Sequence, residues 1–96
     1  MNISEAQKIL DDELLHFRNK SYEELHDFMG SPCVLERKGG EGVLYTIEIE
    51  VFWDNLKQAG GDLRVIGSID DGKFLSALKP LSTDFIMDPK GKFVGE

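Results

Sequence analysis

Hydrophobic residues occupy every second position along residues 45–53 of this chain, and polar residues occupy the positions between them up to Glu50. The alternating positions are, on one side, Tyr45, Ile47, Ile49, Val51 and Trp53, and on the other, Thr46, Glu48, Glu50 and Phe52. Because successive side chains of an extended chain point to opposite faces, this pattern predicts a β-strand with one apolar face. We expect the face that carries the two glutamates to be the exposed one.

The first thirty residues show helical spacing instead. Apolar residues recur three and four positions apart, at Ala6, Ile9, Leu10, Leu14 and Phe17. Ser4 and Gln7 match a capping box, so we predict a helix over residues 4–18 whose apolar stripe covers the apolar side of the sheet. Ser21 and Glu24 repeat the capping box and begin a second, shorter helix, which Gly30 ends.

After Gly30 the period of the pattern becomes strand-like. Strands are predicted over residues 33–38, 43–53, 63–69 and 73–79, and Pro80 ends the last of them. Gly67 interrupts the apolar face of the third strand, which indicates a bulge or the close approach of a helix. Residues 81–96 contain an apolar patch at residues 85–87 and a turn at residues 88–91, with no strand predicted there.

The short connections between these strands decide the fold class. A parallel return needs a crossover of about a dozen residues, so strands joined by hairpin-length loops must be antiparallel. The sequence therefore predicts a single α+β domain over residues 1–96. An N-terminal helix, kinked or in two segments, packs on a four-stranded antiparallel meander sheet.

The charge of the chain limits its partners. Eighteen acidic and eleven basic side chains give a formal net charge of -7. Phosphate backbones attract clustered Lys and Arg, so nucleic-acid binding is not expected. The acidic surface either serves solubility or docks to a basic partner, such as a nuclease whose groove it could occupy; the second alternative would make the chain an immunity or inhibitor protein.

Compartment signals are few. Cys33 is the one cysteine, so no internal disulfide can form, and we interpret it as a small buried hydrophobe in preference to a reactive thiol. The N-terminus lacks a secretion signal, and no apolar stretch approaches the roughly 20 residues that cross a bilayer. We therefore expect a cytoplasmic bacterial protein without a membrane partner.

Candidate catalytic chemistry is sparse. His16 and His26 lie on different helical segments, and we predict neither a metal site nor a cofactor. Glu48 and Glu50 share a strand face at a spacing of roughly 6 to 7 Å, where a desolvated carboxyl could do acid–base work. The alternatives are that the two carboxylates are solvated or form an ion pair with Arg64 of the neighbouring strand, or that they contact a ligand or partner.

Trp53 ends the apolar strand face and is expected in the core. A second interpretation makes it one wall of a pocket between helix and sheet, lined by Leu14, Phe17, Trp53 and Met87. That pocket would support a small-molecule-binding or enzymatic function.

The order of these elements resembles a known class. A capped helix, the short helix SYEELHDFMG and the strand run beginning CVLERKGGEGVLYTIEIEVFW are similar in order to cystatin-like α+β folds, and within them to small members of the nuclear transport factor two-like superfamily. The resemblance covers residues 4–79 and implies a pocket between helix and curved sheet and dimerisation through the sheet. The third helix of that superfamily, its catalytic Asp-His pair and the cystatin Gln-x-Val-x-Gly loop are missing, so no functional residue is carried over.

The exposed sheet face is therefore the leading candidate site. Phe52 and Ile66 are apolar residues on the face that no helix is predicted to cover. Exposure of apolar groups to water is unfavourable there unless a binding partner covers them. We expect a non-enzymatic domain that binds a protein partner or a second copy of itself. The predicted contact residues are Thr46, Glu48, Glu50, Phe52, Arg64 and Ile66.

Overall fold

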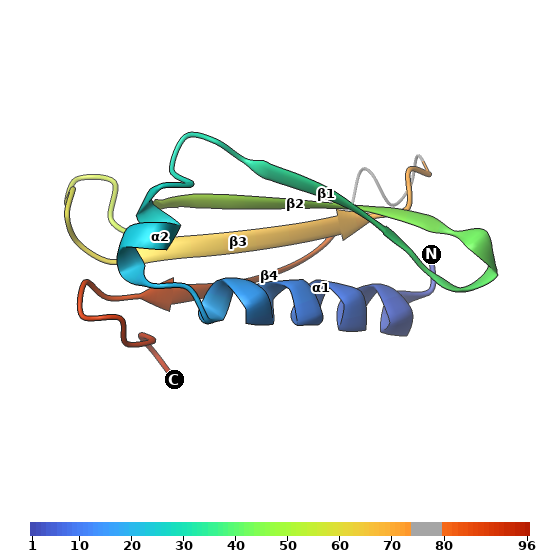
Figure 1. The fold of residues 1–96 in the computed structure, drawn as a ribbon, viewed down its shortest axis with the longest axis horizontal. Coiled ribbons are helices and arrows are strands. Elements are labelled where there is room, and N and C mark those ends of the chain that lie inside the picture. The colour runs from blue at the N-terminus through green and yellow to red at the C-terminus, as the bar shows by residue number, and fades with distance from the viewer. Residues whose placement is uncertain (74–79) are drawn as a thin grey trace.

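A computed structural model describes residues 1–73 and 80–96. Two helices come first, α1 (Ile3–Arg18) and α2 (Tyr22–His26), and the strands β1 (Cys33–Lys38), β2 (Leu44–Trp53), β3 (Leu63–Asp70) and β4 (Leu81–Met87) follow. A short 3-10 turn, η1 (Gly40–Gly42), joins β1 to β2. Figure 1 shows α1 lying lengthwise along the sheet, with α2 at the end of the sheet next to the C-terminal end of α1.

Within the described residues the four strands form one antiparallel sheet in the order β1-β2-β3-β4. The predicted α+β fold with a covering helix and a four-stranded meander is confirmed. The fourth strand is Leu81–Met87, where the sequence predicted none. The predicted strand at residues 73–79 falls almost wholly on residues 74–79, which lie outside the described residues.

The N-cap residue of α1 differs from the predicted one. Asn2, not Ser4, is the N-cap residue, and its Oδ1 accepts a hydrogen bond of 3.0 Å from the Glu5 backbone N–H. An asparagine side chain serves this role as well as serine does, so the helix starts one residue earlier. The predicted capping box of α2 is confirmed, because Ser21 and Glu24 exchange both hydrogen bonds.

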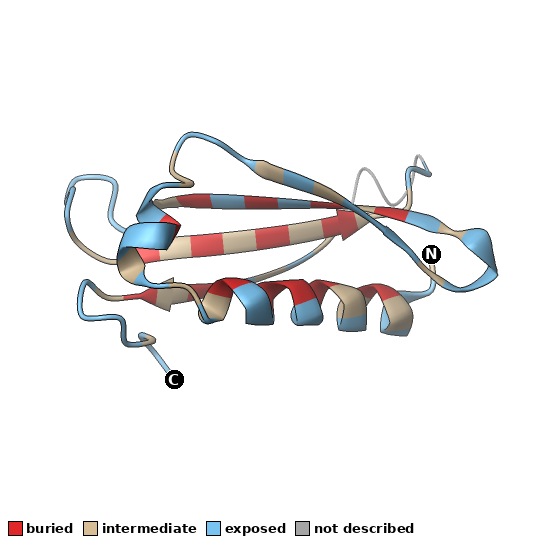
Figure 2. Ribbon diagram, in the orientation of Figure 1, coloured by how far each residue is buried: buried red, intermediate tan, exposed pale blue. Residues whose placement is uncertain are grey.

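The alternation along β2 decides which side of the sheet α1 covers. Tyr45, Ile47 and Ile49 are at most 1% exposed, whereas Glu48 and Glu50 are exposed. Figure 2 shows this alternation of buried and exposed residues along β2. The predicted assignment of the two faces is therefore confirmed.

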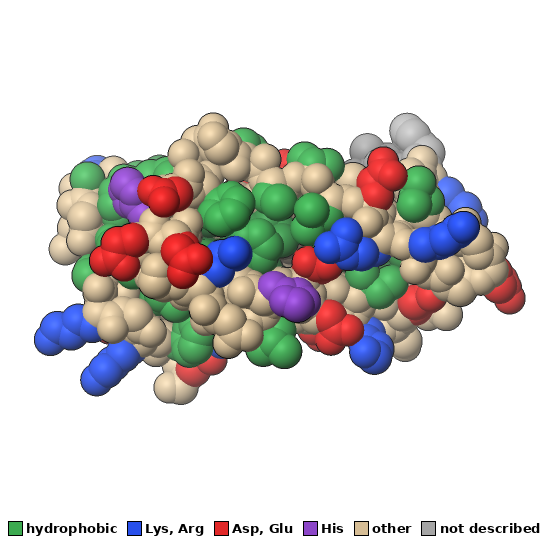
Figure 3. Space-filling view, viewed as in Figure 1, with side chains coloured by type: hydrophobic (Ala, Val, Ile, Leu, Met, Phe, Trp, Pro, Cys, Tyr) green, Lys and Arg blue, Asp and Glu red, His purple; other side chains and the backbone are tan. Residues whose placement is uncertain are grey.

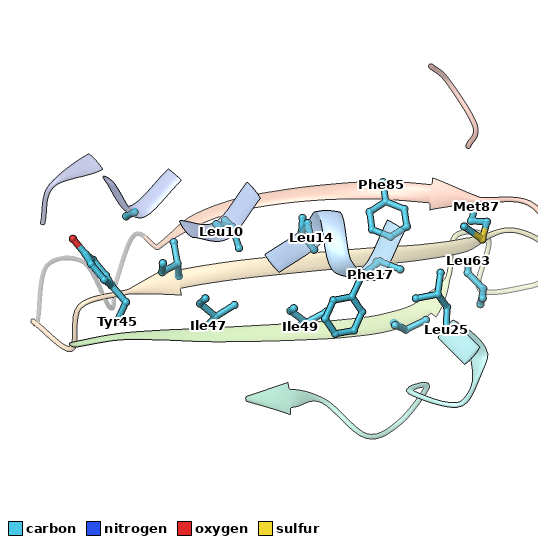
Figure 4. Packing of buried hydrophobic residues seen from close by; sticks show 14 residues of the cluster. Leu10, Leu14, Phe17, Leu25, Tyr45, Ile47, Ile49, Leu63, Phe85 and Met87 are labelled. Carbon is cyan, nitrogen blue, oxygen red and sulfur yellow. The ribbon is translucent and has the colours of Figure 1, made fainter. Parts of the chain in front are cut away.

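The core lies between α1, α2 and the covered side of the sheet. Figure 4 shows Leu10, Leu14 and Phe17 of α1 among the core side chains, together with Ile47 and Ile49 of β2. Removing these side chains from water is the main stabilising term, at about 25 cal/mol per Å² of apolar surface. The buried hydrophobic residues are Ala6, Leu10, Leu14, Phe17, Leu25, Tyr45, Ile47, Ile49, Val51, Leu63, Val65, Ile69, Phe85 and Met87.

Gly67 permits the close packing of α1 on β3. A Cβ atom at this position would lie 3.0 Å from Leu10 Cδ1 and 3.2 Å from Leu14 Cδ2. These distances are shorter than ordinary van der Waals contacts between carbon atoms. Of the two alternatives predicted for Gly67, the close approach of a helix is confirmed.

The α1 helix packs chiefly on β3 and β4, so the β1 side of the sheet is only partly covered. Cys33 and Leu35, the helix-side residues of β1, are half-buried against the core. Figure 3 shows hydrophobic side chains gathered on the visible surface between α1 and β1. Further along β1, Arg37 forms an ion pair of 2.6 Å with the buried Glu13 of α1, which fastens this edge strand to the helix.

Among the described residues, neither helix is long and apolar enough to span a bilayer.

Candidate functional site

The side of the sheet opposite α1, which we call the open face, carries the predicted binding residues. The strand register places its side chains in rows that run across the four strands. Its members alternate with the buried residues of each strand: Val34, Glu36, Thr46, Glu48, Glu50, Phe52, Arg64, Ile66, Ser68, Asp70, Ser82, Asp84 and Ile86. All six residues proposed from the sequence therefore share one face, and their role in binding stays a prediction.

Apolar side chains interrupt the polar surface of the open face. Phe52 and Ile86 flank Arg64 in one row, and Ile66 lies between Glu50 and Asp84 in the next. Phe52, Ile66 and Ile86 are half-exposed, and Val34 on β1 is 60% exposed. The open face is therefore a mixed surface, with apolar groups in contact with water between charged ones.

Arg64 is held by aspartates and not by the glutamates of β2. Its guanidinium donates a hydrogen bond of 2.9 Å to Asp54 Oδ1 and one of 2.5 Å to Asp84 Oδ2. Of the two alternatives predicted together for Glu48 and Glu50, the ion pair with Arg64 is therefore wrong, whereas both carboxylates are exposed to solvent as the other requires. The reason is tertiary: Arg64 lies opposite Phe52 and Ile86 in the sheet, and the loop after β2 brings Asp54 to it.

Glu48 and Glu50 form a carboxyl pair on the open face. A side-chain hydrogen bond with Glu50 is the largest influence on Glu48 and raises its pKa, and desolvation and the negative charges of Glu50 and Asp70 raise it further. Hydrogen bonding between two carboxyls requires a proton, so Glu48 holds its proton more readily than an isolated glutamate does. Among the residues that the structure describes, no Lys or Arg forms an ion pair with either carboxylate.

A hollow of about 290 Å³ adjoins this pair; we call it the Glu50 hollow. It lies beside the part of β2 that β1 does not pair with. The first residue of β1, Cys33, pairs with Ile49, and β2 continues four residues further to Trp53. The segment between α2 and β1 forms the opposite wall. The lining residues are Met29, Gly30, Pro32, Glu50, Val51 and Phe52.

Three of the four residues proposed to line a pocket between helix and sheet lie in the packed core. Leu14, Phe17 and Met87 are at most 4% exposed and belong to the packed core. Trp53 is half-buried, and its ring lies 5.4 Å from that of His26. The pocket predicted from these four residues stays a prediction.

A polar hollow lies at the other end of the sheet, and no pattern in the sequence indicated it. Its volume is about 370 Å³, and Glu5, Tyr45 and Gly40 contribute to its lining. Glu5 accepts a hydrogen bond from the Gly40 backbone N–H through Oε1 and one of 3.0 Å from the Tyr45 hydroxyl through Oε2. These partners lie thirty-five and forty residues from Glu5 in the chain, so no local pattern could have connected them.

These contacts assign Glu5 a structural task. Its carboxylate fastens the first turn of α1 to the turn between β1 and β2. Burial and the hydrogen bond to Glu5 raise the pKa of Tyr45. Because the carboxylate already holds two donors, we consider the open face, and not this hollow, the candidate functional site.

Metal-ligating side chains do not gather in the described part of the chain, where no three His, Cys, Asp or Glu residues lie close enough to hold an ion. His26 contacts Trp53 instead. Cys33 packs against the core on the helix side of β1, but it is half-buried and not buried as the sequence interpretation had it.

Comparison with family models, curated proteins and solved structures found no match for this chain. The arrangement of helix and sheet is shown by the structure itself, and membership of the cystatin-like class stays a prediction.

Proposed function

We propose that this protein is a non-enzymatic interaction module that binds another protein through its open face. One observation supports this proposal above the others: half-exposed Phe52, Ile66 and Ile86 lie on a sheet face that neither α1 nor α2 covers. A sheet face that meets only water is ordinarily polar. Apolar groups gathered on such a face are typical of binding surfaces.

The mixed character of the open face supports a protein partner over a small molecule. Its apolar groups are spread over neighbouring rows and separated by charged residues, whereas small-molecule sites are concave and mostly apolar. Protein interfaces combine an apolar centre with a polar rim, and Ile66 between Glu50 and Asp84 fits that arrangement. The partner is either a different protein or a second copy of this chain.

Site-specific photo-crosslinking tests this function in the cell that makes the protein. A photoreactive amino acid is placed at Ser68, in the middle of the open face, or at Lys8, whose side chain is 78% exposed on α1. We expect a discrete crosslinked product from position 68 and none from position 8. Products of equal yield from both positions, or none from position 68, would contradict the proposal.

Light scattering coupled to size-exclusion chromatography separates the two kinds of partner. If a second copy occupies the face, the protein is a dimer and the Phe52→Ala, Ile66→Ala double variant is a monomer. If the wild-type protein is a monomer, the crosslinked product of position 68 must have the mass of a heterologous complex. A dimer that the double variant leaves intact would exclude self-association through this face.

A further inference from the structure

We propose that the Glu50 hollow receives a lysine or arginine side chain of a basic partner protein. This inference rests on the proposed function and names the chemistry of the partner at one point of the open face. It follows from the shape of the hollow, the character of its walls and the charge beside it.

The walls of the hollow suit the stem of a long basic side chain. Met29, Pro32 and Phe52 provide apolar contact, and Glu50 supplies a carboxylate. Lysine and arginine bury their methylene groups against apolar surface while the charged head stays near water or a carboxylate. Phe52 is half-exposed, and aromatic rings are groups with which cations interact favourably.

The charge around the hollow is not balanced from within the described chain. Arg64, the basic residue nearest in the sheet register, already pairs with Asp54 and Asp84. The carboxyls of Glu48 and Glu50 have each other as neighbours. A cation from outside would therefore meet surplus negative charge, which favours a basic partner.

The mutual influence of the two carboxyls supports the same conclusion. The pKa of Glu48 is raised by its hydrogen bond to Glu50 and by the negative charge of Glu50. A guanidinium beside the pair would stabilise both carboxylates and lower that pKa. A second copy docked face to face would bring further carboxylates to the same region, which disfavours self-association here.

Binding of an octa-arginine peptide to the purified protein tests the inference. Three variants each remove one negative charge: Glu50→Gln at the hollow, Glu36→Gln on the same face and Asp11→Asn on α1. Glu36 lies opposite Thr46, four residues along β2 from Glu50 or roughly 13 Å by strand rise. We expect Glu50→Gln to raise Kd about tenfold at low salt, and each control variant to raise it less than twofold.

The pattern of losses distinguishes this inference from the proposed function. Equal losses for Glu50→Gln and Glu36→Gln, with none for Asp11→Asn, would overturn the hollow as the anchor and leave the open face as the binding surface. Equal losses in all three variants would show attraction by net charge alone and would overturn the inference. The proposed function would then still be decided by the crosslinks from position 68.

Amide chemical shifts of the wild-type protein give an independent measurement. Titration with the same peptide should shift the signals of Met29, Gly30 and Phe52 before those of Asp11 and Asp12. Shifts concentrated on α1, with the signals around the Glu50 hollow unchanged, would overturn the inference.

Discussion

The hydroxyl of Tyr45 donates a hydrogen bond of 3.0 Å to Glu5 Oε2, which joins the start of β2 to the first turn of α1. Tyr45 is fully buried, so its hydroxyl needs a partner within the protein. Glu5 supplies it and at the same time accepts the Gly40 N–H. One carboxylate therefore fixes the position of the helix relative to the hairpin turn.

This contact predicts a loss of stability at alkaline pH. Burial and Glu5 raise the pKa of Tyr45 above its ordinary value of 10.0, so the folded protein keeps the phenol proton when the unfolded chain loses it. The stabilising contribution is complete below pH 10.0 and declines as the pH rises through the folded pKa. In Tyr45→Phe, the free energy of unfolding should fall less steeply above pH 10.0 than in the wild type.

Urea titrations at a series of alkaline pH values measure this difference. Tyr22, whose pKa is also raised by burial, donates its hydroxyl to the Gly61 carbonyl and provides the matched control. Tyr22→Phe should remove only its own part of the pH dependence. Parallel curves for the wild type and Tyr45→Phe would contradict the prediction.

The contact between Gly67 and α1 predicts a steric effect. Gly67→Val places methyl groups where Leu10 and Leu14 already lie, since a Cβ alone would be 3.0 Å from Leu10 Cδ1. We expect a loss of about 2 kcal/mol in the free energy of unfolding, as for other overpacked cores. Urea denaturation measures it.

A double-mutant cycle with Leu10→Ala separates crowding from other effects of the valine. Leu10→Ala alone should cost about 3 kcal/mol, and the double variant should lose less than the sum of the two, because the smaller side chain makes room. Additive losses would mean that Gly67 is not limited by Leu10.

The carboxyl pair predicts that Glu48→Gln stabilises the protein at neutral pH. Glu48 has a raised pKa in the folded state, so its contribution is most favourable below the ordinary value of 4.5 and is lost as the pH rises through the folded pKa. The variant removes a negative charge that Glu50 and Asp70 repel. Its gain over the wild type should be present at pH 7 and shrink toward pH 4.

Thermal or urea unfolding at the two pH values checks this expectation. Glu36→Gln, which removes a carboxylate from the same face on β1, should give a smaller difference between pH 7 and pH 4. A Glu48→Gln variant that is less stable than the wild type at pH 7 would refute the repulsion between the carboxyls.

Arg18 of α1 attaches the C-terminal segment to the helix, which leads to a prediction about stability. Its guanidinium lies 4.9 Å from the ring centre of Phe85 and 4.7 Å from that of Phe93, and it donates hydrogen bonds of 2.8 and 2.7 Å to Glu96. We expect Arg18→Ala to cost about 1 kcal/mol, mainly through lost contact with the two rings, because the ion pair is partly exposed and screened. Arg18→Lys should recover only part of this, since an ammonium lacks the planar stacking surface.

Urea denaturation and amide exchange of residues 93–96 measure the effect. Lys8→Ala breaks an exposed ion pair with Asp12 on the same helix and should cost no more than about 0.5 kcal/mol. Equal losses for Arg18→Ala and Lys8→Ala would show that the rings contribute nothing.

The sequence by itself determined which residues face inward. The two-residue period of Tyr45 to Trp53 and the helical period of residues 6–17 are local properties, and burial follows them because only one face of each element can leave water. The same reasoning placed Glu48, Glu50, Phe52, Arg64 and Ile66 together on the open face. At Gly67 the sequence left a bulge and the close approach of a helix as alternatives, and the contacts with Leu10 and Leu14 decided between them.

Only the tertiary structure decided how these elements meet. In β4, Phe85 and Met87 are buried, but the inward position before them is Thr83, so the short segment lacks a clear apolar alternation and was not predicted as a strand. Three features join residues that are distant in the chain. They are the ion pairs of Arg64 with Asp54 and Asp84, the hydrogen bond between Tyr45 and Glu5, and the Glu50 hollow. Such contacts depend on strand register and on where β1 stops, which a periodic pattern along one segment does not encode.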